Sequence, residues 1–176
     1  MTDQLAWALD RARAQTLSLV ADVPDDAMGR QLAPGEPHPG WLLGHLLLAD
    51  TYLLFLLGVE PLPGDFQAQL ERYGPASAPT AGTLHDSRDQ LVHRLRHTHE
   101  RRLARIRSMT DAELARPLPD AYLAQAQPTI GHHLHSQVFH EGYHAGQLAS
   151  WRKAHGFAAV RWTLGPGEAD ERDGDA

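Results

Sequence analysis

Apolar residues recur at the three- and four-residue spacing of amphipathic helices along four stretches of the chain. The first stretch covers residues 2–23, from a cap at Thr2 or Asp3, and Pro24 ends its pattern. The second, residues 41–57, is apolar almost all round, which predicts a helix covered on every side by other helices or a subunit interface. Within it, His45 is an exception that shares a face with large neighbours, so we expect its side chain to point inward.

The third predicted helix opens at Thr83, which stands three residues before Asp86 as in a capping box, and runs to residue 109. The fourth begins after a cap at Thr129 and continues to about residue 155, with Gly156 as its stop. Arginines on the third helix are interpreted as a solvated outer face. They are Arg94, Arg96, Arg101, Arg102, Arg105 and Arg107.

Segments rich in Pro and Gly join these helices. Residues 24–40 and 58–82 contain too many Pro and Gly for long regular elements, although 65–73 fits one short helix. No stretch has a convincing strand pattern. We therefore predict an all-α fold, a four-helix bundle with long Pro/Gly-rich connections. One domain would cover residues 1–165, followed by an acidic, disordered tail over 166–176.

The composition limits the partners that the protein could bind and the side chains that could hold a metal. With a net charge of −6, the 176-residue chain has no general basic field for nucleic acid. It contains no cysteine, so a metal would be held by His, Asp, Glu and water. The N-terminus lacks a signal-peptide pattern, and residues 41–57 fall short of the about 20 apolar residues of a membrane span. We expect a cytoplasmic protein that binds neither nucleic acid nor membranes.

Five of the twelve histidines fall between residues 131 and 148. On a helix, His140 and His144 are one turn apart on one face, close enough to share a metal ion, and His133 lies on the same stripe. The inward His45 supplies a third ligand and leaves a position open for water or substrate. Three neutral imidazoles suit Zn²⁺ or Ni²⁺ first, and then Fe²⁺ or Mn²⁺.

Two other interpretations use histidine pairs. Residues 140–144 fit H-E-x-x-H, in which Glu141 would be the general base of a zinc peptidase, but neither a third ligand downstream nor a substrate-binding strand accompanies them. The pair His93 and His97, with His99 nearby, stands among arginines that disfavour a dication, so these are interpreted as surface histidines. The same interpretation applies to His132, His135 and His155.

The motifs W-L-L-G-H-L at 41–46 and H-E-G-Y-H-A-G-Q-L at 140–148, with a late Arg152, resemble the DinB-like (DinB/YfiT) superfamily of metal-binding four-helix bundle proteins. The resemblance extends from the first helix to about Gly156. It implies a metal held by His45, His140 and His144, with water in the remaining positions, and frequently a homodimer. The all-histidine ligand set is nearest the bacillithiol-transferase type, whereas the mycothiol-dependent isomerase type has a carboxylate ligand.

This resemblance implies a metal-dependent thiol S-transferase as the first hypothesis. A low-molecular-weight thiol such as bacillithiol would occupy the open metal position, its pKa would fall, and its sulfur would attack a small electrophilic substrate such as an epoxide or alkyl halide. One alternative is a hydrolase with metal-activated water, in which Glu141 or His133 moves the proton. Another is a non-enzymatic stress-response protein that binds a metal or small ligand.

Overall fold

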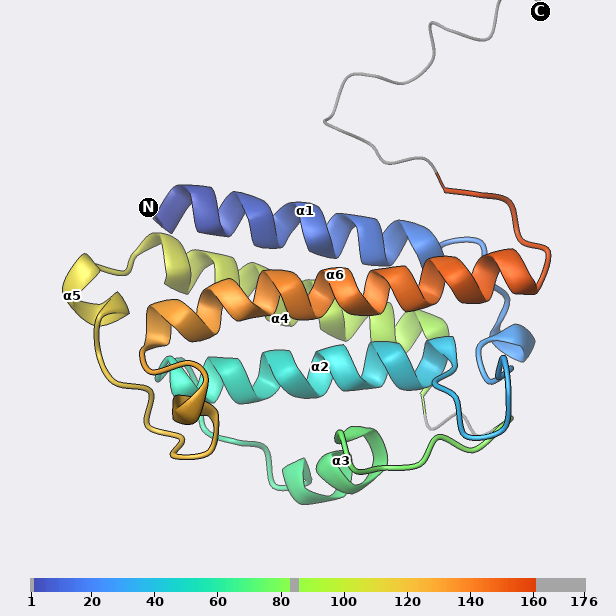
Figure 1. Cartoon of the computed structure of the whole chain (residues 1–176), viewed down its shortest axis with the longest axis horizontal. Helices are drawn as coiled ribbons and strands as arrows, with labels where there is room; N and C mark the ends of the chain where they lie inside the picture. Colours follow the sequence, from blue (N-terminus) through green and yellow to red (C-terminus); the bar gives the residue numbers. More distant parts are fainter. Residues whose placement is uncertain (1, 83–85, 161–176) are drawn as a thin grey trace, which may run out of the picture.

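The computed structural model describes residues 2–82 and 86–160, whose regular elements are all helices joined by loops and turns (Figure 1). Within these ranges there is no strand, only an isolated bridge between Pro117 and Thr129. The all-α prediction is confirmed. The α-helices are α1 (Thr2–Val20), α2 (Pro39–Leu56), α3 (Phe66–Tyr73), α4 (Arg88–Arg107), α5 (Asp111–Leu114) and α6 (Ile130–Ala154), with short 3₁₀ helices at Asp25–Ala27 and Leu123–Gln125.

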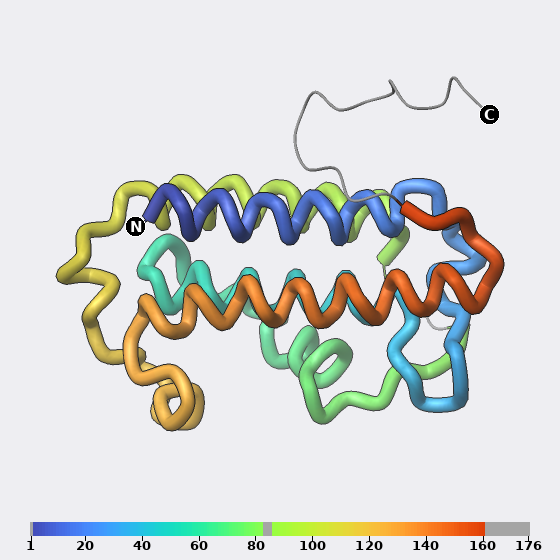
Figure 2. The backbone as a smooth tube through the Cα atoms, turned by 45° about the horizontal axis from the view of Figure 1, so that its top comes forward, coloured from blue at the N-terminus to red at the C-terminus, as the bar shows by residue number. Residues whose placement is uncertain are grey.

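The four long helices lie side by side along the long axis of the molecule (Figures 1 and 2). Each packs on two neighbours, in the closed order α1, α6, α2, α4 and back to α1. Helices α1 and α6 run in one direction, and α2 and α4 run in the other (Figure 1). The short helix α3 packs on α2 in the connection between α2 and α4. The predicted acidic tail lies outside the described residues.

Local hydrogen bonds fix the ends of α2 and α6. The His38 ring caps α2 by accepting a hydrogen bond from the backbone N–H of Trp41, and Pro39 occupies the first turn. Thr129 caps α6, as predicted, and Gly156 follows its end with a φ of 76°. Such a left-handed conformation is easily adopted only by glycine, which explains why the helix stops there.

The predicted start of the third long helix is wrong. Helix α4 begins at Arg88, after a capping box in which Ser87 accepts a hydrogen bond from the backbone N–H of Gln90 while the Gln90 side chain accepts one from the Ser87 backbone. Asp86 precedes the helix as a bend, and Thr83 lies outside the described residues. A Ser/Gln pair thus takes the part that the sequence pattern assigned to Thr83 and Asp86.

The apolar core is divided into two clusters by a polar layer. One cluster gathers Leu42, Leu46, Leu95 and Leu148, and the other gathers residues that include Leu9, Leu53, Ile106 and Leu134. Each long helix carries one buried charged residue between the positions that belong to the two clusters. These residues are Arg13 on α1, Asp50 on α2, Arg102 on α4 and Glu141 on α6.

These four side chains form a neutral ionic cluster, here called the ionic layer. Arg13 donates to both oxygens of Glu141, at 2.5 and 2.9 Å, and to Asp50 at 2.9 Å. Arg102 donates to the other Asp50 oxygen at 2.5 Å. Burial alone would raise the pKa of Asp50, but Arg102 and Arg13 outweigh it and hold this pKa below its usual range. Two guanidinium groups and two carboxylates therefore compensate one another inside the protein.

Two residues assigned to the surface belong to this buried region instead. Arg102, expected on the outer face of its helix, is 1% exposed. His99, expected among surface histidines, is also buried: its Nδ1 accepts a hydrogen bond from Arg102, and its Nε2 lies 3.1 Å from a carboxylate oxygen of Asp10 on α1. Both predictions are wrong because carboxylates on other helices supply the partners that make burial tolerable.

Helix α2 is the central element of the core. Among the described residues, this helix alone is long and apolar enough to meet a simple test for a membrane span. However, 72% of the Pro39–Leu56 segment is buried inside the protein. Its apolar surface is therefore covered by the neighbouring helices, as expected for a core helix.

The ionic layer predicts a large stability loss for Asp50→Ala, because the substitution leaves the buried Arg13 and Arg102 partly uncompensated. We expect the free energy of unfolding, measured with urea, to fall by roughly 3–5 kcal/mol. Asp26→Ala, which breaks an exposed pair with Arg30, is the control and should cost less than about 1 kcal/mol. Equal losses in the two variants would contradict a structural role for the layer.

Candidate metal centre

Three histidines from two helices converge on one point. His45 comes from α2, and His140 and His144 come from α6. Their candidate ligand nitrogens all lie within 4.8 Å of one another, and the Nε2 atom of His140 lies 3.0 Å from the Nε2 atoms of both His45 and His144. The structure thus brings together the three residues that the sequence identified as metal ligands.

In two of these imidazole rings, the other ring nitrogen makes a hydrogen bond that orients the ring. The Nδ1–H of His45 donates to the backbone carbonyl of Tyr73 at 2.7 Å, and the Nδ1–H of His144 donates to the side-chain oxygen of Gln147 at 2.6 Å. Because a carbonyl oxygen only accepts, the Nε2 atoms of both rings carry lone pairs that point to the same region. His140 can donate one hydrogen to only one of them. A cation among the three nitrogens would satisfy all the lone pairs, which is the arrangement of a three-histidine metal site.

The placement of His45 depends on its neighbours in the chain. A side chain at Gly44 would overlap the Tyr73 ring, so glycine lets the end of α3 approach α2 closely. The Trp41 ring stacks on the His45 ring, with centroids 4.9 Å apart, while its indole N–H donates to the Arg72 carbonyl and to Ser77. The Tyr73 carbonyl at the end of α3 and the Trp41 ring of α2 therefore hold the His45 imidazole from two sides.

All three histidines are suited to bind a metal at neutral pH. Burial, reinforced by the neighbouring imidazoles, lowers the pKa of His140 to about 4. Burial likewise lowers the pKa of His144 to about 4, and it lowers the pKa of His45. Neutral imidazoles are the form that coordinates Zn²⁺, Ni²⁺ and related metals, so these residues need not lose protons before binding.

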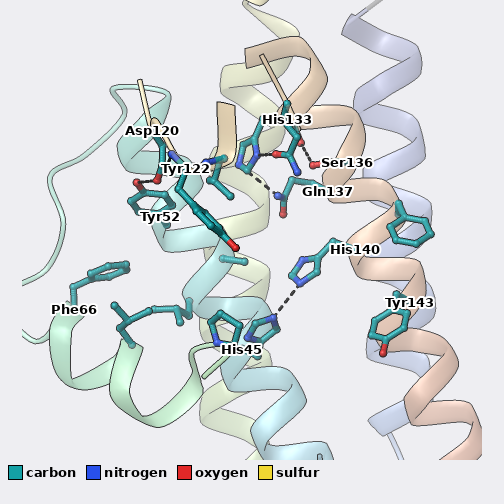
Figure 3. Close-up of a pocket in the computed structure, with 17 residues that line it drawn as sticks. His45, Tyr52, Phe66, Asp120, Tyr122, His133, Ser136, Gln137, His140 and Tyr143 are labelled. Carbon is teal, nitrogen blue, oxygen red and sulfur yellow. Dashed lines mark hydrogen bonds between the residues drawn. The ribbon is translucent and has the colours of Figure 1, made fainter. Parts of the chain in front are cut away.

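A pocket of about 630 Å³ opens beside the histidines (Figure 3). His45 and His140 line one end of it, and its walls include Tyr52, Phe66 and Phe139. Polar residues line the other end, among them Asp120, Gln127, His133 and Gln137. A volume of this size accommodates an organic molecule next to the candidate metal centre.

The two residues predicted to transfer protons occupy different environments. Glu141 directly follows His140, but both of its carboxylate oxygens accept hydrogen bonds from Arg13 in the ionic layer. His133 is buried and lines the pocket, where its Nδ1 contacts the side-chain oxygen of Gln127. The catalytic roles of both residues stay predictions, and the geometry favours Glu141 as a residue that positions α6.

The other histidines that the sequence analysis assigned to the surface are not part of the three-histidine group. His93, His97, His132 and His135 are exposed, as the sequence indicated. His155 is half-buried and stacks on the Trp151 ring, with centroids 4.4 Å apart, so its surface assignment holds only in part.

A bundle of helices whose facing side chains bring three imidazoles together beside a pocket defines a class of helical proteins with a candidate metal site. The family comparison specifies the class further: the model of the DinB superfamily matches residues 8–148. The chain belongs to the DinB superfamily. A search of curated proteins finds no match.

Removing one ligand tests the centre directly. We expect His45→Ala to weaken zinc binding by more than about a hundredfold. Substituting a residue that only hydrogen-bonds to a metal ligand commonly lowers metal affinity about ten- to a hundredfold, and loss of a ligand itself should cost more. His135→Ala, at an exposed position of α6, should bind zinc like the unaltered protein. Metal content would be measured by elemental analysis and zinc affinity by calorimetric titration. Equal zinc affinities in the two variants would contradict a metal site that includes His45.

The lowered histidine pKa values also predict the pH dependence of metal binding. At His140 and His144, protons compete with the metal only as the pH falls toward their pKa of about 4, and the lowered pKa of His45 shifts its protonation in the same direction. Zinc affinity should therefore change little between about pH 7 and pH 5, whereas a site of ordinary histidines would weaken below their pKa of about 6.5. Calorimetric zinc titrations across this range give the comparison, and a steep loss already at about pH 6 would contradict the assigned environment.

Proposed function

We propose that this protein is a metal-dependent enzyme that transfers a low-molecular-weight thiol to small electrophiles. The observation that carries the proposal is the position of His45 and His140 at one end of a pocket whose walls are largely aromatic and aliphatic. Such a pocket would bind the organic body of a substrate beside the metal centre. Membership of the DinB superfamily supports the same class of function.

His45, His140 and His144 would hold the metal, with Zn²⁺ or Ni²⁺ first and Fe²⁺ or Mn²⁺ next by the preferences of imidazole ligands. A bound divalent metal lowers the pKa of a thiol or water that coordinates it. The chain's own contribution is orientation: Tyr73 and Gln147 keep two imidazoles in the tautomer that presents Nε2. The apolar walls limit water around the substrate.

In the proposed reaction, no group of the protein becomes part of the product. A bond forms between the sulfur of the thiol and an electrophilic carbon, and the bond from that carbon to its leaving group breaks. The thiol proton passes to solvent or to the leaving group. Because the chain has no cysteine, the sulfur arrives on a separate thiol, for which bacillithiol is the first candidate.

Hydrolysis is supported less well. A metal-dependent hydrolase commonly places a carboxylate or imidazole beside the attacking water as general base. Here Glu141, the carboxylate nearest in sequence to the ligands, is engaged by Arg13, and His133 lies two helical turns from His140. A nucleophile that loses its own proton readily, as a thiol does, has less need of such a base.

Turnover of monochlorobimane, an alkyl chloride whose thioether product is fluorescent, tests the proposal. The zinc- or nickel-loaded protein should accelerate product formation with bacillithiol, and cysteine and mycothiol serve as comparison thiols. His45→Ala should reduce the rate to that of the uncatalysed reaction, whereas His135→Ala should retain it. Consumption of the electrophile without thiol would indicate a hydrolase, and absence of turnover over a panel of electrophiles and thiols would favour a binding protein.

A further inference from the structure

The end of the pocket away from the metal centre has its own set of polar groups. His133 and His140 are seven residues apart on the same face of α6, so about 10 Å of helix separates them. Figure 3 shows His133 and Gln137 toward one end of the pocket, near Asp120 and Tyr52, and His45 and His140 toward the other. A ligand that fills the pocket therefore meets two different chemical environments.

Asp120 is held in place at the polar end by several donors. The Tyr52 hydroxyl donates to one carboxylate oxygen at 2.6 Å, and the backbone N–H groups of Tyr122 and Leu123 donate to the other, each at 2.9 Å. These contacts fix the carboxylate at the start of the turn that lines the pocket. The oxygen that accepts from Tyr52 keeps a lone pair for a further donor, whereas the other oxygen already accepts two hydrogen bonds.

His133 and Gln137 add adaptable hydrogen-bonding groups. The His133 Nδ1–H donates to the Gln127 side chain, so its Nε2 is an acceptor. The Gln137 amide nitrogen lies 3.4 Å from this Nε2, a long contact that a better-placed donor can replace. Both side chains line the pocket and are available to a ligand.

The charge of this end is negative. Of the described residues that line the pocket, none is Lys or Arg, and Asp120 is the one carboxylate among them. The Tyr52 hydrogen bond, followed by those of the backbone, lowers the pKa of Asp120, while burial lowers the pKa of His133 and favours its neutral form. A second carboxylate entering here would meet repulsion without a compensating cation.

We propose that Asp120, His133 and Gln137 form a ligand subsite for a primary amine carried by an apolar body, about 10 Å from the metal centre. The ammonium group donates to the Asp120 carboxylate and to His133 Nε2 or the Gln137 amide oxygen. Tyr52, Phe66 and Phe139 cover the apolar body of the ligand. The subsite binds an uncharged hydroxyl more weakly and disfavours a carboxylate. The proposal rests on the proposed function only in taking this pocket as the substrate site.

Three matched probes test the subsite: phenylbutylamine, phenylbutanol and phenylbutyrate, which share one apolar body. Their binding would be measured by calorimetry or by NMR shifts on the chelator-treated, metal-free protein. We expect the amine to bind at least about tenfold more tightly than the carboxylate, with the alcohol between them, since charge-assisted hydrogen bonds are worth more than neutral ones. Equal binding of amine and carboxylate, or no binding of any probe, overturns the proposal.

Substitutions test which residues cause the preference for the amine probe. Asp120→Asn keeps the oxygen that caps the turn but removes the charge, so the affinities for amine and carboxylate should come within about threefold of each other while alcohol binding stays the same. Gln137→Leu should weaken amine and alcohol together. His135→Ala, exposed on the same helix, is the control and should change none of the three affinities. An unchanged preference in Asp120→Asn, with helicity intact by circular dichroism, overturns the proposal.

The outcomes separate this subsite from the proposed enzyme activity. Amine preference in the metal-free protein without thiol transfer by the metal-loaded protein would support the subsite and reject the transferase. Thiol transfer without amine preference would support the transferase and reject the subsite.

Discussion

Buried charge compensation between Arg13, Asp50, Arg102 and Glu141 connects all four long helices. Each of these side chains would be costly to bury alone, so the helices are held to rotations at which every charge meets its partner. Glu141 directs one face of α6 toward the interior, and at about 100° per residue this directs His140 and His144 toward α2. The ionic layer therefore acts on the candidate metal centre through geometry, although none of its residues belongs to the three-histidine group.

The three grouped histidines were recognisable as candidate ligands because each one breaks a strong local pattern. His140 and His144 have helical spacing, and His45 is a polar residue in a nearly apolar helix. The burial of Arg102 was not predictable from its own helix, because its partner Asp50 lies 52 residues away in the chain. Two indications were present: Asp50 interrupts the apolar α2, and Arg13 falls beside apolar positions of α1. Neither indication identifies the distant residue that carries the compensating charge.

The polar end of the pocket depends in part on a different kind of structure from the end at the histidines. Helices supply His45 and His140, whose positions follow from packing of the core, whereas Asp120 and Gln127 come from the irregular connection between α5 and α6. Connections tolerate substitution and changes of length more readily than core helices. The ligand preference of this scaffold can therefore vary at the polar end while the histidine geometry stays the same. The same division explains why helical patterns located the three histidines and His133 but not Asp120 or Gln127.

The stacking of Trp41 on His45 gives the protein an internal optical probe. The two rings are nearly parallel, at 8°, and the indole is held by hydrogen bonds to Arg72 and Ser77. Coordination at His45 Nε2 withdraws electron density from the imidazole and so changes the electrostatic environment of the adjacent indole. If a metal binds the three histidines, the fluorescence of Trp41 should change on binding, with quenching by a paramagnetic ion such as Ni²⁺ and a shift with Zn²⁺. Metal exchange can thus be followed in real time without an added dye.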